Sequence, residues 1–485
     1  MQVLKDILYG ISLQSLTGDR EISVSSVAFD SRKVEKDALF VAVKGLTVDG
    51  HDYIDQAIKN GAQAIVCEFL PEEVDEKLTY VQTINSAQAL GIIASNFYGR
   101  PSEKIKLIGI TGTNGKTTCA TLLHELFINM GYQTGLLSTV ENKIGHKVLD
   151  ASYTTPDAVQ LNELLAQMVS EGCTHCFMEV SSHALVQQRV AGIHFSGAVF
   201  TNISHDHLDY HKTFDEYISA KKILFDGLSS EAFALVNADD KRAMVMLQNT
   251  KADKFRLGIK SMADFRVRII HNTLQGLELN FNGVDVWFKL IGEFNAYNIL
   301  TAYAVGLLLG EDGEDILSGL SISNGASGRF EKIDNKSNVL AVVDYAHTPD
   351  ALENVLNTID QLRTKNELLV TVVGCGGDRD KSKRPEMARI AAALSDKVIL
   401  TSDNPRSEDP KKILEDMKAG IPKSFERNLM VIEDRKEAIR TACNLAGSQD
   451  IILVAGKGHE NYQEINGERH HFDDREILNE LLNDS

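Results

Sequence analysis

The most constraining feature of the sequence is a glycine-containing loop between an apolar segment and a helical one, IGITGTNGKTTCATLLHEL at residues 108–126. This order predicts a strand, a loop and a helix that ends at Gly131. In such loops, backbone N–H groups and the helix N-terminus surround an anion, while a lysine and a hydroxyl serve phosphate and Mg²⁺. The usual pattern has a glycine at the position of Ile110, whereas the first glycine here is Gly112. The Lys-Thr pair still favours phosphate binding over an ordinary turn, which needs neither residue.

Length and composition limit the other possibilities. A chain of 485 residues is long enough for about three domains, each with its own core. The net charge of −18 argues against a nucleic-acid-binding protein, so an anionic substrate must meet local cations. No targeting segment or membrane-spanning stretch is evident, and we expect a cytoplasmic protein with no membrane partner. The single C-x-x-C pair, Cys173 and Cys176, suits apolar filling better than a redox or zinc site.

Three consecutive segments predict an α/β protein of three domains. Residues 1–98 mix short strands with helical stretches such as YIDQAIKNGAQAIVCE, which predicts a small N-terminal α/β domain. Residues 99–328 contain the loop and alternate strand and helix signals, as in a P-loop ATPase-like domain with a parallel or mixed sheet. Residues 329–485 alternate most regularly, which predicts a Rossmann-like, largely parallel sheet covered by helices.

Polar side chains follow two apolar strands of the middle segment. Glu179 lies in or at the end of the strand in HCFMEVSSHAL, where a carboxylate needs either Mg²⁺ or another buried partner. The loop after the next strand carries Asp206, His207 and Asp209. Because the carboxyl ends of such strands converge beside the phosphate loop, we favour a metal site over a hydrated polar loop.

Lys221 lies on the core-facing side of a predicted helix, TFDEYISAKKILFD. At about 100° per residue it shares a stripe with Phe214, Ile218 and Phe225. The spacing favours an aliphatic stem that lies along the surface with its ammonium in water. The alternative is a lysine of depressed pKa that reacts with carbon dioxide to give an anionic carbamate.

Loops after the strands of the third segment carry two arginines, an amide and a carboxylate, which are Arg379, Asn404, Arg406 and Glu460. Arg379 replaces the third glycine of a dinucleotide fingerprint in GCGGDR, which argues against nicotinamide binding. Guanidinium groups bind carboxylates through paired N–H donors, and Glu460 would pair with an ammonium group. The set therefore suits a zwitterion, with a surface salt-bridge cluster as the alternative.

Together these stretches resemble the ATP-dependent Mur ligases of bacterial cell-wall synthesis, over all three segments. The resemblance rests on TGTNGKTT at 111–118, TTPD at 154–157, MEVSSHAL at 178–185, DHLDYH at 206–211, GEFNAYN at 292–298, SGRFE at 327–331, DYAHTPD at 344–350 and GCGGDRDKSKRP at 374–385. It is greatest for the members that add the third residue of the peptide stem. It implies a monomer that uses ATP and Mg²⁺, with UDP-N-acetylmuramoyl-L-Ala-D-Glu and meso-diaminopimelate as substrates and an acyl phosphate as intermediate.

The resemblance also implies a role for each candidate residue. Catalytic roles are implied for Lys116, Lys221 and His207. ATP contacts are implied at Gly112, Thr113, Asn114, Gly115, Lys116, Thr117, Thr118, Asn295, Arg329 and Asp344. Contacts with the nucleotide-sugar dipeptide are implied at Ser31, Thr154, Thr155, Ser181, Gln187 and Arg189. Metal ligands are implied at Thr117, Glu179, His207 and Lys221 as a carbamate. Amino-acid contacts are implied at Arg379, Asp403, Asn404, Pro405, Arg406, Ser407, Gly456 and Glu460.

Arg406 decides which amino acid we expect. The distal carboxylate of meso-diaminopimelate can pair with a guanidinium, whereas lysine ends in an ammonium that Arg406 would repel. Arg379 is expected to share that carboxylate. The alternatives are the lysine-adding type, a folylpolyglutamate synthetase or, outside enzymes, a P-loop nucleotide switch. A switch would have no need of the cation-rich third site.

Overall fold

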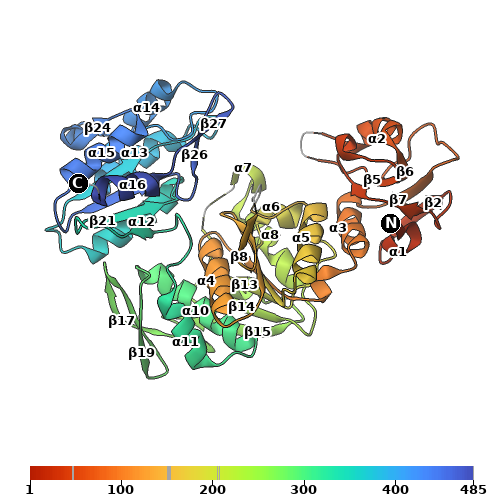
Figure 1. Cartoon of the computed structure of the whole chain (residues 1–485), viewed down its shortest axis with the longest axis horizontal. Coiled ribbons are helices and arrows are strands. Elements are labelled where there is room, and N and C mark those ends of the chain that lie inside the picture. Colours follow the sequence, from red (N-terminus) through yellow and green to blue (C-terminus); the bar gives the residue numbers. More distant parts are fainter. Residues whose placement is uncertain (46–47, 150–153, 205, 207, 484–485) are drawn as a thin grey trace. The chain divides into compact units, whose positions relative to one another are not determined.

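The computed structural model describes residues 1–45, 48–149, 154–204, 206 and 208–483, and Figure 1 labels its helices and strands. The chain forms two compact units, Met1–Arg266 with Asn298–Gly319, and Val267–Tyr297 with Leu320–Ser485. Within the described ranges, no helix has both the length and the apolar character needed to cross a membrane.

The first sheet of the N-terminal unit has five strands in the order β2-β7-β6-β5-β4, parallel except for the β2/β7 pair. The strands are β2 (Leu13–Thr17), β4 (Val27–Ala28), β5 (Ala38–Val41), β6 (Ala62–Cys67) and β7 (Thr79–Thr83). The prediction of a continuous helix over YIDQAIKNGAQAIVCE is wrong. Helix α2 (Ile54–Asn60) ends where Gly61 adopts φ 113°, and the apolar run that follows is β6.

The second sheet of this unit contains the phosphate loop and has nine strands, in the order β11-β10-β9-β12-β8-β13-β14-β15-β16. Five of them are β9 (Thr134–Leu137), β11 (Lys147–Leu149), β14 (Phe233–Asn237), β15 (Asp253–Gly258) and β16 (Phe265–Arg266). Strand β8 (Lys106–Thr111) lies between β12 (His175–Glu179) and β13 (Gly197–Phe200), and both pairs are parallel. Strand β10 (Asn142–Ile144) pairs antiparallel with its neighbours, so the sheet is mixed. The associated helices include α4 (Lys116–Asn129), α5 (Ala158–Ser170), α6 (Ser182–Val186) and α8 (Phe214–Asp226).

The C-terminal unit has a six-stranded sheet in the order β20-β21-β25-β22-β23-β24, parallel except for the β20/β21 pair. Its strands are β20 (Glu331–Ile333), β21 (Leu340–Asp344), β22 (Leu369–Val373), β23 (Lys397–Leu400), β24 (Leu429–Val431) and β25 (Ile451–Ala455). Its helices include α12 (Pro349–Leu362), α13 (Lys383–Leu394), α14 (Pro410–Lys418), α15 (Arg435–Leu445) and α16 (Asp474–Asn483). The predicted alternation of parallel strands and helices is confirmed.

All six cysteines lie in the described part of the chain and are free thiols. Five are buried, and only Cys443 is partly exposed. Cys173 and Cys176 belong to the apolar core of the nine-stranded sheet, and burial raises the pKa of both thiols. Their surroundings favour the interpretation as apolar filling.

Candidate active site

The phosphate loop connects β8 to α4 and is fastened to the segment that follows β13. The Thr113 N–H donates to the Asn202 carbonyl (2.8 Å), and the Asn114 N–H donates to Asn202 Oδ1 (2.9 Å). Gly112 adopts φ 153°, and a Cβ there would lie 1.9 Å from Thr201 Oγ1. The close approach explains why this position needs a glycine.

Two lysines converge on this loop. Lys116 Nζ donates to the carbonyl oxygens of Gly112 (3.0 Å) and Thr113 (2.9 Å). Lys221 Nζ, from α8, donates to the same Gly112 oxygen at 2.8 Å and lies 4.4 Å from the centre of the Tyr217 ring. Lys221 is 1% exposed, and its burial, followed by the charge of Lys116, holds its pKa well below the usual value. The interpretation of Lys221 as a surface side chain with its ammonium in water is therefore wrong.

Glu179 is the last residue of β12, and its register partner on β8 is Ile110, the second-to-last residue of that strand. The side chain is fully buried. Its carboxylate accepts from the Thr139 N–H (2.8 Å) and from Thr139 Oγ1 (3.2 Å). Thr139 thus supplies hydrogen bonds of the kind that a buried carboxylate needs.

The metal prediction depends on Thr117, Glu179, Lys221 and His207. His207 lies outside the described residues. Across the remainder of the described chain, no group of three or more His, Cys, Asp or Glu side chains is placed to hold a metal ion. Thr117 and Glu179 are buried oxygen donors, the type that Mg²⁺ prefers. The donors present therefore fit a cation that also takes ligands from bound phosphates.

Four predicted dipeptide-binding residues form one hydrogen-bonded cluster at the C-terminal end of β12. Arg189 donates to the Thr155 carbonyl (2.8 Å) and, through Nε and Nη2, to Gln187 Oε1 (2.9 and 2.6 Å). Thr155 Oγ1 donates to the Glu179 carbonyl (2.9 Å) and accepts from the Ser181 N–H (3.1 Å). The structure therefore brings Thr155, Ser181, Gln187 and Arg189 together beside Glu179.

The other two predicted dipeptide-binding residues lie outside this cluster. Thr154 Oγ1 lies within hydrogen-bond distance of Thr139 Oγ1 (3.0 Å), which links it to the residue that contacts Glu179. Ser31 lies between β4 and β5, where it begins a short 3-10 helix capped by Asp30. Asn60 Nδ2 donates to the Ser31 carbonyl at 2.8 Å.

In the C-terminal unit, two of the three predicted nucleotide contacts lie together. Asp344 ends β21 and accepts from the Phe330 N–H at 2.6 Å. Burial raises the pKa of Asp344 to about 6, opposed by the positive charge of Arg329. The Arg329 guanidinium lies 4.7 Å from the centre of the Tyr345 ring. Asn295, in α10 (Glu293–Leu308), donates to the Ile291 carbonyl at 2.9 Å.

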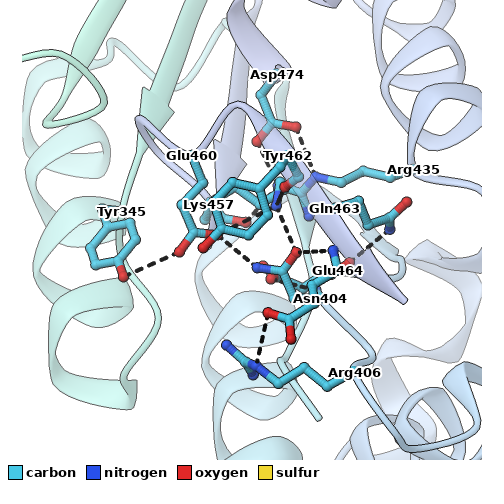
Figure 2. A network of polar contacts seen from close by, with 12 residues as sticks. Tyr345, Asn404, Arg406, Arg435, Lys457, Glu460, Tyr462, Gln463, Glu464 and Asp474 are labelled. Atoms are coloured by element: carbon cyan, nitrogen blue, oxygen red, sulfur yellow. Dashed lines mark hydrogen bonds and ion pairs between the residues drawn. The ribbon is translucent and has the colours of Figure 1, made fainter. Parts of the chain in front are cut away.

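Figure 2 shows the predicted amino-acid site, where Asn404 lies among charged side chains from the loops after β23 and β25. Asn404 Nδ2 donates to Glu460 Oε2 at 2.7 Å, and the Asn404 side chain is 1% exposed. Burial and the nearby Asp403 carboxylate raise the pKa of Glu460, while Lys457 opposes that rise. The centre of the site is therefore buried and hydrogen-bonded, unlike a surface salt-bridge cluster.

Arg406 lies at the edge of this network with a left-handed backbone, φ 51°. Its Nη1 donates to the Gly377 carbonyl (2.7 Å), and its Nε lies 3.7 Å from Glu464 Oε2. A Cβ on Gly376 would lie 2.9 Å from Arg406 Nη1 and 3.9 Å from Arg379 Cγ. Both arginine side chains therefore lie beside Gly376.

The other predicted amino-acid contacts support the same loops. Ser407 Oγ donates to Asp378 Oδ1 (2.7 Å), and a Cβ on Gly377 would lie 1.9 Å from the Pro405 carbonyl oxygen. A Cβ on Gly456 would lie 2.7 Å from Asp403 Oδ2, which places that glycine against the Asp403 carboxylate.

Sequence reasoning missed three residues of these sites, Thr139, Tyr345 and Lys457. Lys457 is 0% exposed and donates to Asn404 Oδ1 at 3.1 Å. Tyr345 OH donates to Glu460 Oε1 at 3.4 Å. The available signal for Lys457 was a lysine between two glycines directly after the apolar strand in ILVAGKGHE.

The chain matches three family domains in order. The Mur ligase family catalytic domain matches residues 23–98, the Mur ligase middle domain matches 110–306, and the Mur ligase glutamate ligase domain matches 328–458. The three matched regions together include the phosphate loop, the segment around Glu179 and the loop that carries Asn404.

Similar proteins extend over the full length. Two proteins named UDP-N-acetylmuramoyl-L-alanyl-D-glutamate--2,6-diaminopimelate ligase, from Cytophaga hutchinsonii and Phocaeicola vulgatus, are 57% and 50% identical, each over 99% of both chains. A solved structure of a ligase of that name is 34% identical and superposes with a TM-score of 0.71 over 99% of this chain and 98% of the other. The order of the three domains and the identity over the full length show that the chain belongs to the Mur ligase family.

Proposed function

We propose that the chain is an ATP-dependent ligase that joins meso-2,6-diaminopimelate to UDP-N-acetylmuramoyl-L-alanyl-D-glutamate during peptidoglycan precursor synthesis. The observation that carries this proposal is the set of opposite charges around Asn404, with Arg406 on one side and Glu460 on the other. A guanidinium and a carboxylate so arranged suit the distal carboxylate and ammonium groups of a diamino diacid. We further propose that it acts as a cytoplasmic monomer, because its substrates are water-soluble and its own segments supply every site.

We assign the three substrates to three domains. Residues 1–98 would bind the uridine diphosphate end through Ser31, residues 99–328 would bind ATP, and residues 329–485 would bind the amino acid. The order of the three matched family domains supports this division. We also propose that Asn295, Arg329 and Asp344 contact the nucleotide.

The phosphate loop would activate the glutamyl carboxylate. A carboxylate does not react with an amine because its leaving group would be oxide, so its oxygen first attacks the ATP γ-phosphorus and ADP leaves. Lys116 would leave the Gly112 carbonyl to neutralise phosphate oxygens. Mg²⁺, where bound, supplies further positive charge to those oxygens, with Thr117, Glu179, His207 and the carbamate of Lys221 as its donors.

Lys221 would form that carbamate. The uncharged amine nitrogen attacks the carbon of carbon dioxide, a proton leaves the nitrogen, and a carboxylate results. The low pKa of Lys221 supports this step, because only the uncharged amine is nucleophilic. The product would convert a buried cation beside the phosphate loop into an anionic ligand.

The second half-reaction would use the amino-acid site. Arg406 and Arg379 would hold the distal carboxylate, while Glu460 and the Gly456 carbonyl would hold the ammonium at the same end. The other amino group would attack the acyl phosphate carbon, and phosphate would leave as the amide bond forms. Thr154, Thr155, Ser181, Gln187 and Arg189 would hold the dipeptide in place.

Phosphate release tests the proposal. We expect release to require ATP, the nucleotide-sugar dipeptide and meso-diaminopimelate together, with L-lysine a much poorer substrate. Equal turnover of L-lysine would favour the lysine-adding type instead. Full-rate release with ATP alone would favour a nucleotide switch and contradict the ligase proposal.

A further inference from the structure

Lys457 is a fully buried cation at the centre of the amino-acid site, and none of the roles given above includes it. It follows β25, with Gly456 and Gly458 on either side. Its ammonium donates to Asn404 Oδ1 (3.1 Å), to Glu460 Oε2 (3.4 Å) and to the Tyr462 carbonyl (Figure 2). Three acceptors use all three N–H donors of a lysine.

These contacts determine how the Asn404 amide is oriented. Its Oδ1 atom accepts from Lys457 and from the Glu464 N–H (2.9 Å). Because both partners are donors, the opposite amide orientation would place an NH₂ group against two N–H groups. The Asn404 NH₂ group is therefore directed at Glu460 Oε2, 2.7 Å away.

The same contacts distinguish the two oxygens of Glu460. Oε2 accepts from Asn404 and lies within reach of Lys457, whereas Oε1 accepts one long hydrogen bond, from Tyr345 OH at 3.4 Å. Oε1 is therefore the atom with capacity for a further donor. An ammonium group at that position would make a charge-assisted hydrogen bond to a carboxylate already held in place.

We propose that Lys457 is a positioning residue for the amino-acid site, which fixes Asn404 and Glu460 Oε2 so that Glu460 Oε1 receives the ammonium of the incoming amino acid. This role rests on the proposed function. It also includes charge, since Lys457 lowers the pKa of Glu460, which burial and the Asp403 carboxylate raise. A neutral Glu460 would accept an ammonium far less well than an anionic one.

The electrostatic surroundings of Glu460 determine the expected pH dependence. Burial and then Asp403 raise the pKa of Glu460, and Lys457 lowers it. Tyr345, Tyr462 and Arg435 also interact with Glu460 electrostatically. Without the charge of Lys457 the pKa of Glu460 rises further. Glu460 would then lose its negative charge at a higher pH, which moves the acid limb of the pH profile upward.

The test is the kinetics of full-length Lys457→Met from acid to neutral pH, with each of the three substrates varied in turn. We expect the KM for meso-diaminopimelate to rise about tenfold or more, as for loss of a hydrogen bond to a charged group, while the KM for ATP changes by less than about twofold. The acid limb of kcat/KM for the amino acid should move to higher pH. Lys457→Gln keeps an N–H donor but no charge. It should move the acid limb as far as Lys457→Met does, with a smaller rise in the KM for meso-diaminopimelate.

A double-mutant cycle with Asn404→Ala tests the route through Asn404. If Lys457 acts through this amide, Lys457→Met should lower kcat/KM for the amino acid by a smaller factor in the Asn404→Ala background than in the wild type. An equal loss of kcat/KM for the amino acid in both backgrounds would overturn the role of Lys457. A fall in kcat with no change in the KM for the amino acid and no shift of the acid limb would also overturn it. An inactive wild-type enzyme would instead refute the proposed function.

Discussion

Lys116 and Lys221 donate hydrogen bonds to the same atom, the carbonyl oxygen of Gly112, at 3.0 and 2.8 Å. Two ammonium groups on one acceptor repel each other, and the fully buried Lys221 has the lowered pKa. Of the two lysines at this loop, Lys221 is therefore the one whose uncharged amine is more readily reached. The proposed roles differ accordingly, with phosphate neutralisation for Lys116 and carbamate formation for Lys221.

Replacement of Lys221 by alanine tests the carbamate. We expect Lys221→Ala to lower kcat by roughly 100-fold, the cost of removing one preorganised electrostatic group. Added acetate or propionate should restore part of the activity, because a small carboxylate can occupy the space of the carbamate. The neighbouring Lys222, which pairs with Asp226 on the exposed side of α8, provides the control, and Lys222→Ala should remain active. An absence of rescue in a folded variant would contradict the carbamate.

Arg406 should control the choice of amino acid. We expect Arg406→Ala to raise the KM for meso-diaminopimelate by about 10- to 100-fold, because a charged hydrogen-bonding partner of the distal carboxylate is lost. The KM for ATP should change little. Arg469, whose guanidinium stacks 4.3 Å from the centre of the Tyr462 ring, is a matched control, and Arg469→Ala should leave both values nearly unchanged. Equal losses for both substrates would contradict the assignment.

The close approach at Gly112 predicts a local effect on nucleotide binding. Gly112→Ala would place a methyl group 1.9 Å from Thr201 Oγ1, which must displace the loop. We expect ATP-dependent turnover to be lost. Gly131→Ala also introduces a methyl group at positive φ, but with no heavy atom within 4 Å, so it should cost only about 1 kcal/mol of stability and retain activity. Calorimetry can compare the ATP affinities of the two variants. Similar affinities would contradict the predicted effect of Gly112→Ala on nucleotide binding.

The buried ion pair between Arg435 and Asp474 predicts a large effect on stability. Both side chains are fully buried, and two hydrogen bonds of 2.8 Å join them. Arg435→Met would leave an unpaired buried carboxylate and should destabilise the fold by about 3–5 kcal/mol. Lys436 and Glu480 form an exposed pair on the same two helices, so Lys436→Met should cost less than about 1 kcal/mol. The melting temperatures of the full-length Arg435→Met and Lys436→Met variants compare the two losses of stability.

Local sequence patterns predicted the elements on which the sites are built. The apolar run before Gly112, the glycine after Met130 and the regular alternation after residue 329 each reflect interactions within a few residues. The same reasoning extended a helix through Gly61, because the apolar residues beyond it fit a buried strand as well as a helix face. Only tertiary pairing with the neighbouring strands decides between them.

The polar partners within the sites were harder to predict. The helical phase correctly placed Lys221 on the buried face, but its acceptor lies 109 residues away in the sequence. Lys457 is likewise 53 residues from Asn404, and no local pattern pairs an ammonium with a distant amide. The candidate residues were recognisable by their motifs. Their hydrogen-bond partners were not, because these partners come from strands that are distant in the sequence and end at the same edge of the sheet.

The burial of the native thiols has a practical consequence. Because none of the six cysteines is fully exposed and burial raises the pKa of Cys443 to about 11, maleimide dyes should react slowly with the unmodified chain. A pair of cysteines engineered on two surface loops would then accept fluorophores selectively. Energy transfer between the dyes could follow substrate-driven movements without first removing any native sulfur.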